Sequence, residues 1–367
     1  MKNAFTFRLI VAISFLSMST VILAQTITTP RAPSPAAEVS QTIGISTVSI
    51  NYSRPSVKGR VVWGELVPYG RNVEPFGSPH PAPWRAGANE NTVIEFSHAA
   101  MVEGKMVPAG RYGLFFTMNN NNTGEVILSK DSHSWGNFFY EPANDLCRAN
   151  IQLRDHAMTE MLTYEFINVG ANSAELVLNW EKKQFPVQIE FAVEEIVMAN
   201  AEEQLKGEMG FTWEGLSSAA NYSLEHKINT ERGLYWAERA VVFNKNFTTL
   251  NTKAALLRLN GRTDEADKMQ EEAMTLANEV DLNAYGYQLL NNGHLDGAIK
   301  AFKGNTDRHP ESANAWDSFG EGYAIKGDKQ NAIKVFKKSL TLNPAENVKA
   351  NSEKYLKQLG GSKICEK

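Results

Sequence analysis

The chain has 367 residues, of which 43% are hydrophobic and 21% charged, and its formal net charge is −4. This length exceeds that of most single domains, so two domains are expected, with enough apolar material for a sizeable core. The acidic balance argues against a nucleic-acid partner, because nucleic-acid-binding proteins normally carry a basic domain or stripe.

The first 24 residues have the pattern of a secretory signal peptide. Lys2 and Arg8 precede an apolar run that ends at Ala24, a small residue suited to cleavage. The run is short for a bilayer span, so we favour a cleaved signal over a retained anchor. We therefore expect an exported protein, periplasmic or secreted, with no membrane span after cleavage. Residues 25–37 are rich in Pro, Ser and Thr and are expected to form a linker.

Cysteine usage excludes a disulfide framework and a multi-cysteine zinc site, because only Cys147 and Cys365 occur. Cys147 falls in a predicted strand and Cys365 in the polar tail, residues 361–367. We expect two independent thiols, with pairing after export as the alternative.

Residues 38–198 mostly show the period-two alternation of β-strands. Val48, Ile50 and Tyr52 alternate with polar residues, and the pattern recurs near residues 162–166, 176–180 and 187–193. Such alternation gives a strand one buried and one solvated face. Polar turn sequences separate the runs and no helical pattern intervenes. This half of the chain is therefore predicted to be an antiparallel β-sandwich or barrel.

The most distinctive stretch, YSRPSVKGRVVWGELVPYG at residues 52–70, gathers cations and aromatic residues, and residues 84–90, WRAGANE, add more. One interpretation is a site for a polar or anionic ligand, formed by Tyr52, Arg54, Lys58, Arg60, Trp84, Arg85, Asn89 and Glu90. Guanidinium groups bind carboxylates or phosphates through paired hydrogen bonds, and aromatic faces stack on sugars or rings. The other interpretation is an internal network, in which the arginines pair with Glu65 or Glu90 and hold long loops on the sandwich.

These two motifs are followed by VPAGRYGLF at 107–115 and SWGNFFYEPANDLCR at 134–148. Together the four resemble the family catalogued as domain of unknown function 2911, which consists of exported bacterial domains, sometimes followed by tetratricopeptide-like units. The resemblance spans about residues 38–195 and implies an architecture without a reaction, since the family has no established activity. Residues 71–83, RNVEPFGSPHPAP, depart from the family pattern. Their prolines predict a stiff extra loop that would cover or reshape a nearby ligand site.

Motifs that carry chemistry are missing from the sequence. It contains no zinc-peptidase, phosphate-loop or serine-hydrolase motif, and its seven histidines are scattered. No spacing suggests a metal site, and no cofactor is expected. A triad such as Ser53, His98 and Asp145 can be assembled from distant residues, but nothing favours it over other combinations.

Residues 199–360 have apolar positions every three or four residues, which is typical of helices. The sequences 293–302 and 327–336 match at an offset of 34. A period of this length, with two helices per unit, resembles the tetratricopeptide repeat and predicts a short α-solenoid. The clear copies are 313–346 and 279–312, with weaker units from about 210 and a polar capping helix expected at 347–359. Small residues such as Gly320 would let paired helices approach, whereas Gln270 stands where an aromatic residue is expected.

The repeat register places candidate partner-binding residues on the concave face, namely Asn283, Tyr287, Asn314, Asp317 and Glu321. The charges of Asp317 and Glu321 favour a basic or polar segment of a protein or peptide partner. The alternative is a solvated face on repeats that serve only as a rigid spacer.

The sequence thus predicts a multidomain protein, a β-sandwich followed by a tetratricopeptide-like solenoid, that acts as a non-enzymatic binding or scaffold protein of the cell envelope. The β domain would hold a polar or anionic ligand, carbohydrate included, and the repeats a partner. The competing interpretation is a hydrolase of envelope or extracellular polymers, with acid and base residues assembled across loops.

Overall fold

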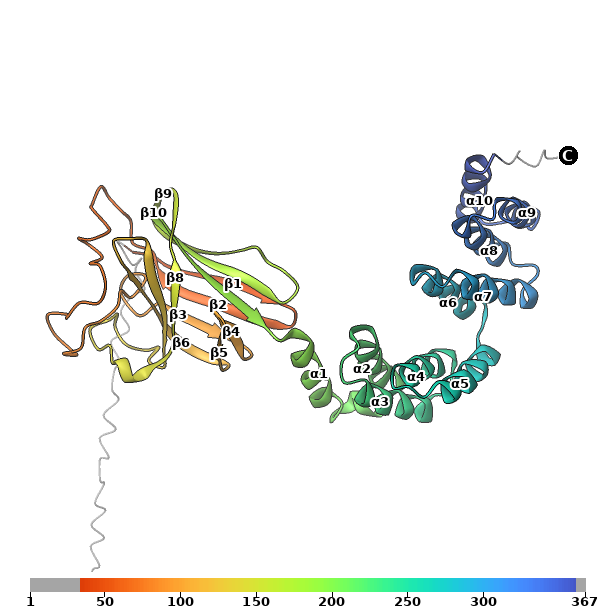
Figure 1. The fold of residues 1–367 in the computed structure, drawn as a ribbon, viewed down its shortest axis with the longest axis horizontal. Coiled ribbons are helices and arrows are strands. Elements are labelled where there is room, and N and C mark those ends of the chain that lie inside the picture. The colour runs from red at the N-terminus through yellow and green to blue at the C-terminus, as the bar shows by residue number, and fades with distance from the viewer. Residues whose placement is uncertain (1–33, 361–367) are drawn as a thin grey trace, which may run out of the picture. The chain divides into compact units, whose positions relative to one another are not determined.

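The computed structural model describes residues 34–360. It divides into two compact units between Phe191 and Ala192, the first built of strands and the second of helices (Figure 1). The sequence predicted this division at residue 198. The predicted signal, most of the predicted linker, the tail and Cys365 lie outside the described residues.

The first unit is a sandwich of two antiparallel sheets that do not close into a barrel. Its strands are β1 (Ala36–Ile43), β2 (Ser46–Ser53), β3 (Val93–Phe96), β4 (Ala100–Val102), β5 (Lys105–Val107), β6 (Gly110–Met118), β7 (Thr123–Ser129), β8 (Asp145–Gln152), β9 (Arg154–Ile167) and β10 (Ser173–Phe191). One sheet has the order β1-β2-β3-β6-β7-β8 and the other the order β5-β4-β10-β9. Of the two predicted sheet architectures, the sandwich is the one observed.

The alternation of the sequence sets the buried face of each strand. In β2, Val48 and Ile50 are fully buried. Between the sheets, the rings of Phe116 and Phe185 meet edge to face with centroids 5.3 Å apart. The last predicted strand ends early, because Val193 begins α1 (Val193–Gln204), whose first turn carries two glutamates that suit a helix N-terminus.

Residues 54–92, between β2 and β3, form the long orange segment at the edge of the sandwich in Figure 1. Part of this segment extends the larger sheet, since Trp84 exchanges two backbone hydrogen bonds of 2.9 Å with Phe116 of β6. Another part covers the outer face of that sheet, where Ala82 packs with Phe115, Ile127 and Tyr140. The predicted motif therefore lies in a folded segment and not in a free loop.

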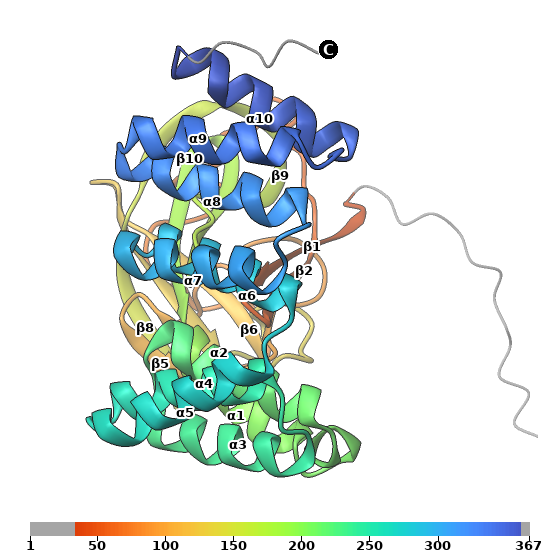
Figure 2. The same cartoon turned by 90° about the vertical axis from the view of Figure 1, so that its right-hand side faces the viewer.

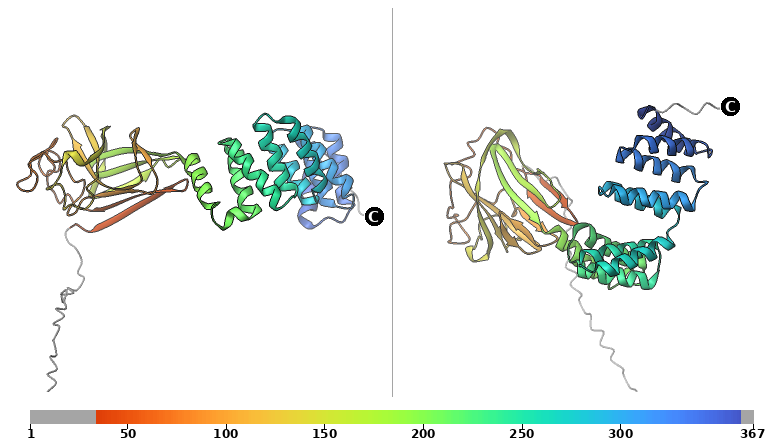
Figure 3. Two further views of the ribbon diagram at one scale, coloured as in Figure 1. Left: turned by 90° about the horizontal axis from the view of Figure 1, so that it is seen from below. Right: turned by 45° about the vertical axis from the view of Figure 1, so that its right-hand side comes forward.

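The second unit contains, within residues 192–360, four helix pairs between α1 and a last helix. The helices that follow α1 are α2 (Trp213–His226), α3 (Thr230–Phe243), α4 (Phe247–Leu259), α5 (Thr263–Leu276), α6 (Glu279–Asn291), α7 (Leu295–Arg308), α8 (Ala313–Lys326), α9 (Lys329–Leu340) and α10 (Glu346–Gln358). The pairs are α2/α3, α4/α5, α6/α7 and α8/α9, and α10 packs on the last pair as the predicted capping helix (Figures 2 and 3).

A small residue in the first helix of a pair makes room for an aromatic ring in the second. A Cβ atom on Gly286 would lie 2.4 Å from the Phe302 ring, and one on Gly320 would lie 2.7 Å from the Phe336 ring. The predicted role of the small residues is confirmed. Gln270, which replaces the aromatic residue in α5, keeps a shielded Nε2 without a hydrogen-bond partner among residues 34–360.

The backbones of α5 and α6 approach each other less closely than those of α3 and α4 or of α7 and α8. Their side chains still meet in a hydrophobic cluster that includes Phe247, Ala273 and Leu282. Arg308 of α7 bridges this junction, because its guanidinium donates to the carbonyl oxygens of Met274 (2.8 Å) and Ala277 (3.2 Å) at the end of α5. Within residues 34–360, no helix has both the length and the apolarity to cross a bilayer.

Candidate functional site

Three of the predicted ligand-binding residues lie outside the cavity that the other five share, which corrects the prediction at these positions. Alternation turns Tyr52 into the sandwich, where it is 7% exposed and its hydroxyl accepts a hydrogen bond from the Tyr164 amide (3.3 Å). Arg54 donates from Nε to the Leu162 carbonyl (2.9 Å) and from Nη2 to Thr163 Oγ1 (2.6 Å). Glu90 is half-buried and lies outside the lining. Tyr52 and Arg54 thus join the start of the long segment to β9, as an internal network, without the predicted glutamate partners.

The other five predicted residues meet at one cavity of about 670 Å³, which we call the basic cavity. They are Lys58, Arg60, Trp84, Arg85 and Asn89. The lining contains three cationic side chains and a single carboxylate, that of Glu74. The cavity therefore has an excess of positive charge in a protein that is acidic overall.

Arg85 is held at the wall of this cavity by contacts other than an ion pair. Its Nη1 donates to the Asn89 carbonyl (3.0 Å), and its guanidinium lies 4.8 Å from the centroid of Phe138. Gly136 has a φ of +69°, and a Cβ there would lie 2.2 Å from Arg85 Nη1, so both its backbone and its size admit the guanidinium. Burial lowers the pKa of Arg85, and the nearby Glu74 carboxylate opposes that shift.

Lys58 and Arg60 differ in whether their charged groups already make hydrogen bonds within the domain. The Lys58 amide donates to Glu160 Oε1 (2.9 Å), but its ammonium has no hydrogen-bond or ion-pair partner between residues 34 and 360. Arg60 donates from Nε to the Val57 carbonyl (3.0 Å) and from Nη2 to the Ser56 carbonyl (2.5 Å). Lys58 is therefore the cation best placed to meet a ligand, while Arg60 also closes its own turn.

Two lining residues that sequence analysis missed carry buried polar atoms without partners. Trp180 is 1% exposed and stacks on Trp84 (5.7 Å between centroids), yet its Nε1 has no acceptor in the described protein. Asn137 donates to Glu74 and to the Pro83 carbonyl, but its Oδ1 is buried and unpaired there. Asn137 lies in the motif at 134–148, and this motif is the sequence feature that could have identified it. Trp180 looked like an ordinary alternating core residue.

Three of the five candidate partner-binding residues, Tyr287, Asp317 and Glu321, are joined in a polar network across α6, α8 and α10. The Tyr287 hydroxyl donates to Glu321 Oε2 (3.1 Å), and Asn351 Nδ2 donates to Asp317 Oδ2 (2.8 Å) and to Glu321 Oε1. Burial raises the pKa of Tyr287. Tyr287 and Glu321 remain partly accessible.

Asp317 differs from the prediction, because α10 covers it. It is 5% exposed, and Oδ1 accepts a hydrogen bond from Ser352. Burial raises the pKa of Asp317, against the opposing effect of its hydrogen bonds from Ser352 and Asn351. Asn314 is exposed, and Asn283 is half-buried with an Oδ1 that has no partner in the described residues.

Comparison with known proteins assigns both units. Residues 34–189 match the family model described as protein of unknown function (DUF2911), and residues 313–346 match that of the tetratricopeptide repeat. The chain contains a DUF2911 domain and a tetratricopeptide repeat. Both resemblances inferred from sequence motifs are confirmed, the second at the copy with the clearest pattern.

Individual relatives match only part of the chain. Human tetratricopeptide repeat protein 7A is 25% identical over 132 residues, 35% of this chain, which spans only 15% of that protein's length. The crystal structure of YrrB, described as a TPR protein with an unusual peptide-binding site, is 20% identical, with coverage of 44% of this chain and 84% of that chain and a TM-score of 0.27. The crystal structure of MamA is 19% identical, with coverage of 43% of this chain and 91% of that chain and a TM-score of 0.28.

Residues 71–83, the departure from the DUF2911 pattern, form a wall and not a free lid. Asn72 and Ala82 exchange backbone hydrogen bonds of 3.0 and 2.8 Å. Gly77 has a φ of +93°, and a Cβ there would lie 2.0 Å from the Phe138 carbonyl oxygen, so the segment packs tightly on the loop that follows β7. Asn72, Val73, Glu74 and Ala82 line the basic cavity, and Arg71 and Pro81 line a second cavity on the other side.

The triad of Ser53, His98 and Asp145 considered from the sequence is not assembled in residues 34–189. Ser53, His98 and Asp145 make no hydrogen bond with one another, since His98 contacts Ser97 and Asp145 accepts from Tyr140 and Arg148. The Ser97–His98 contact (3.0 Å) joins chain neighbours and lines neither cavity. Among residues 34–360, no group of three His, Cys, Asp or Glu is placed to hold a metal ion.

Proposed function

We propose that the protein is an exported, non-enzymatic scaffold of the cell envelope. Its DUF2911 domain would hold an anionic ligand in the basic cavity, and its repeats would dock a protein or peptide partner. The tetratricopeptide repeat supports the scaffold role, because stacked helix pairs present extended faces for protein contact. The ligand role rests on one observation, the presence in a single cavity of a free ammonium and of unpaired buried polar atoms among the described residues.

The ligand class follows from the chemistry of the lining. Lys58 and Arg85 have no carboxylate ion-paired to them in the described domain, so a carboxylate or phosphate would receive charge-assisted hydrogen bonds without breaking a salt bridge. Trp180 Nε1 can donate a hydrogen bond and Asn137 Oδ1 can accept one. A ligand hydroxyl suits both atoms, because it can accept as well as donate. An acidic sugar or a sugar phosphate combines both kinds of group.

Calorimetric titration of the chain from residue 25 onward with uronic acids and sugar phosphates tests this ligand. At least one should bind, and its affinity should fall as salt rises, because salt screens the cations. Lys58→Gln should weaken binding about fivefold, equivalent to about 1 kcal/mol. Lys182→Gln, which changes an exposed lysine outside the lining, should leave the affinity unchanged. Absence of binding across the panel, or equal loss in both variants, would contradict the ligand role.

The partner on the repeats would contact the face that carries Asn283, Tyr287, Asn314 and Glu321. Glu321 is a partly accessible carboxylate, which favours a basic segment over an acidic one. An array of basic and acidic peptides should show selective binding of basic members, reduced by Glu321→Gln and unaffected by Glu311→Gln at an exposed position outside the network. Equal binding of acidic and basic peptides would argue for the rigid-spacer alternative.

Export is tested by the mature terminus. Mass spectrometry of the protein recovered outside the cytoplasm should show a chain that begins at Gln25, immediately after the predicted cleavage position. A cytoplasmic protein that retains Met1 would overturn the proposed localisation.

A further inference from the structure

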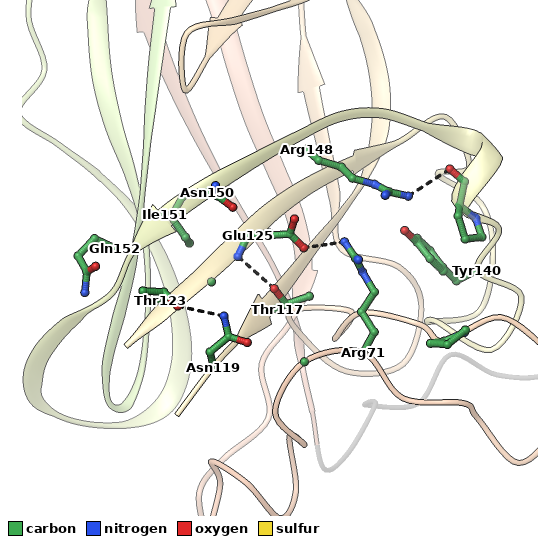
Figure 4. A pocket seen from close by; sticks show the side chains of 14 residues that line it. Arg71, Thr117, Asn119, Thr123, Glu125, Tyr140, Arg148, Asn150, Ile151 and Gln152 are labelled. Atoms are coloured by element: carbon green, nitrogen blue, oxygen red, sulfur yellow. Dashed lines mark hydrogen bonds and ion pairs between the residues drawn. The ribbon is translucent and has the colours of Figure 1, made fainter. Parts of the chain in front are cut away.

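The second cavity of the DUF2911 domain has a volume of about 1040 Å³ and lies on the outer face of the larger sheet (Figure 4). Strand register builds its floor. Glu125 of β7 is opposite Thr117 of β6 on one side and Asn150 of β8 on the other. Their chain neighbour Val126 is buried, which places these polar side chains on the face away from the sandwich interior. We call this floor the outer platform. Thr123 and Gln152 extend it along β7 and β8, and Asn119 extends it just beyond the end of β6.

The outer platform has charged groups, but they are already balanced. Arg71, which projects from the segment 71–83, pairs with Glu125 at 2.6 Å (Figure 4). On β8, Arg148 pairs with Asp145 at 2.5 Å. The basic cavity, in contrast, contains cations without ion-pair partners among residues 34–360. A charged ligand would have to displace one of the salt bridges of the outer platform, so a neutral ligand suits it better.

Several polar atoms of the outer platform remain unused within residues 34–360. The side-chain amide of Asn150 makes no hydrogen bond, and the Glu125 carboxylate accepts one from Arg71 through Oε2 only. Arg71 Nε is shielded from solvent and has no acceptor. The free Glu125 oxygen and the Asn150 side chain therefore lie on neighbouring strands, which are about 4.8 Å apart.

We propose that the outer platform binds a neutral saccharide. Each sugar hydroxyl both donates and accepts, and can therefore serve Glu125 Oε1 and the Asn150 side-chain amide in turn. Adjacent hydroxyls along a sugar ring match the paired hydrogen-bonding groups of amide, carboxylate and guanidinium. The linings of the outer platform and the basic cavity share only Gly70, and the platform takes an uncharged ligand, so either proposal can fail without the other.

Calorimetric titration of the chain from residue 25 onward with neutral oligosaccharides, namely cellopentaose, maltopentaose, xylopentaose and chitopentaose, tests the proposal. One of them should bind with an affinity that changes little between low and high salt. Asn150→Ala, at an exposed position of β8, should weaken this binding about fivefold, the value of one hydrogen bond. Asn119→Ala, also in the lining, provides a second variant that removes a different amide.

The matched control is Asn51→Ala, because Asn51 is a partly exposed asparagine in β2 of the same sheet and lines neither cavity. It should bind as the parent does, and so should Lys58→Gln in the basic cavity. Circular dichroism should show the parent fold in every variant. The proposal is overturned if no neutral oligosaccharide gives saturable binding, if both lining variants bind normally, or if Lys58→Gln abolishes the binding.

Discussion

A single missing methyl group decides how closely the helices of a repeat pack. Gly286 faces the Phe302 ring, so Gly286→Ala must displace that ring and should destabilise the helical unit by about 1–3 kcal/mol. A Cβ added to Gly304, in the same pair of helices, would meet no atom within 4 Å, and Gly304→Ala should stabilise by up to about 1 kcal/mol through helix propensity. Urea unfolding followed by the helical circular-dichroism signal measures both. A change in the free energy of unfolding with the same sign in both variants would refute the packing argument.

Gln270 is the residue-scale defect of the second helix pair. Its Nε2 is shielded and unpaired among the described residues, whereas Met has a similar length and no polar hydrogen. Gln270→Met should therefore raise the free energy of unfolding of the helical unit by about 1 kcal/mol. The same urea measurement decides this, and a lower stability would show that water or a shifted side chain already satisfies the amide.

At the scale of elements, α10 turns the predicted partner-binding Asp317 into an internal group. The raised pKa of Asp317 means that the folded state holds a proton more tightly than the unfolded state, whose value is about 4. Its contribution to stability is present at low pH and is lost as pH rises through the folded-state value. Relative to Asp317→Asn, the parent should lose stability over that range. Urea unfolding at a series of pH values measures this difference, and a parent that gains stability over the variant as pH rises would contradict the assignment.

Sequence periodicity was sufficient for elements whose burial depends on near neighbours. The alternation around Val48 and Ile50 and the offset of 34 that relates the repeats both identified the observed structure. Prediction from periodicity failed for residues whose burial depends on segments far away in the sequence. Tyr52 and Arg54 are bound by β9, more than a hundred positions away, and Asp317 is covered by α10. The composition of the basic cavity was partly predictable because the five predicted residues that line it come from two motifs, while Trp180 reaches it from a distant strand.

For the molecule as a whole, the sparse backbone contact between α5 and α6, which a small hydrophobic cluster bridges, predicts a limit to cooperativity. Stacked repeats unfold together only as far as neighbouring units are coupled. Arg308→Ala removes the two hydrogen bonds from α7 to the end of α5, so α1–α5 and α6–α10 should then exchange their amide hydrogens at separate rates. Hydrogen-exchange mass spectrometry measures this.

The control for the junction is Lys303→Ala on the same helix. This change removes a surface ion pair to Asp307, which contributes little to stability, and should leave the exchange of the two groups of helices as it is in the parent. If Lys303→Ala separated the two rates as much as Arg308→Ala does, the hydrogen bonds to the end of α5 would not be what couples them.

The segment 71–83 has one consequence for the DUF2911 domain as a unit. Because residues of this segment line both cavities, a displacement of the segment from one cavity toward the other would narrow the second and widen the first. Two occupants would then compete for the position of a single strip of chain. Thermodynamic linkage requires that, if the first ligand lowers the affinity for the second, the second lowers the affinity for the first by the same factor. The stretch from Arg71 to Pro83 would in this way make the domain respond to two molecules at once.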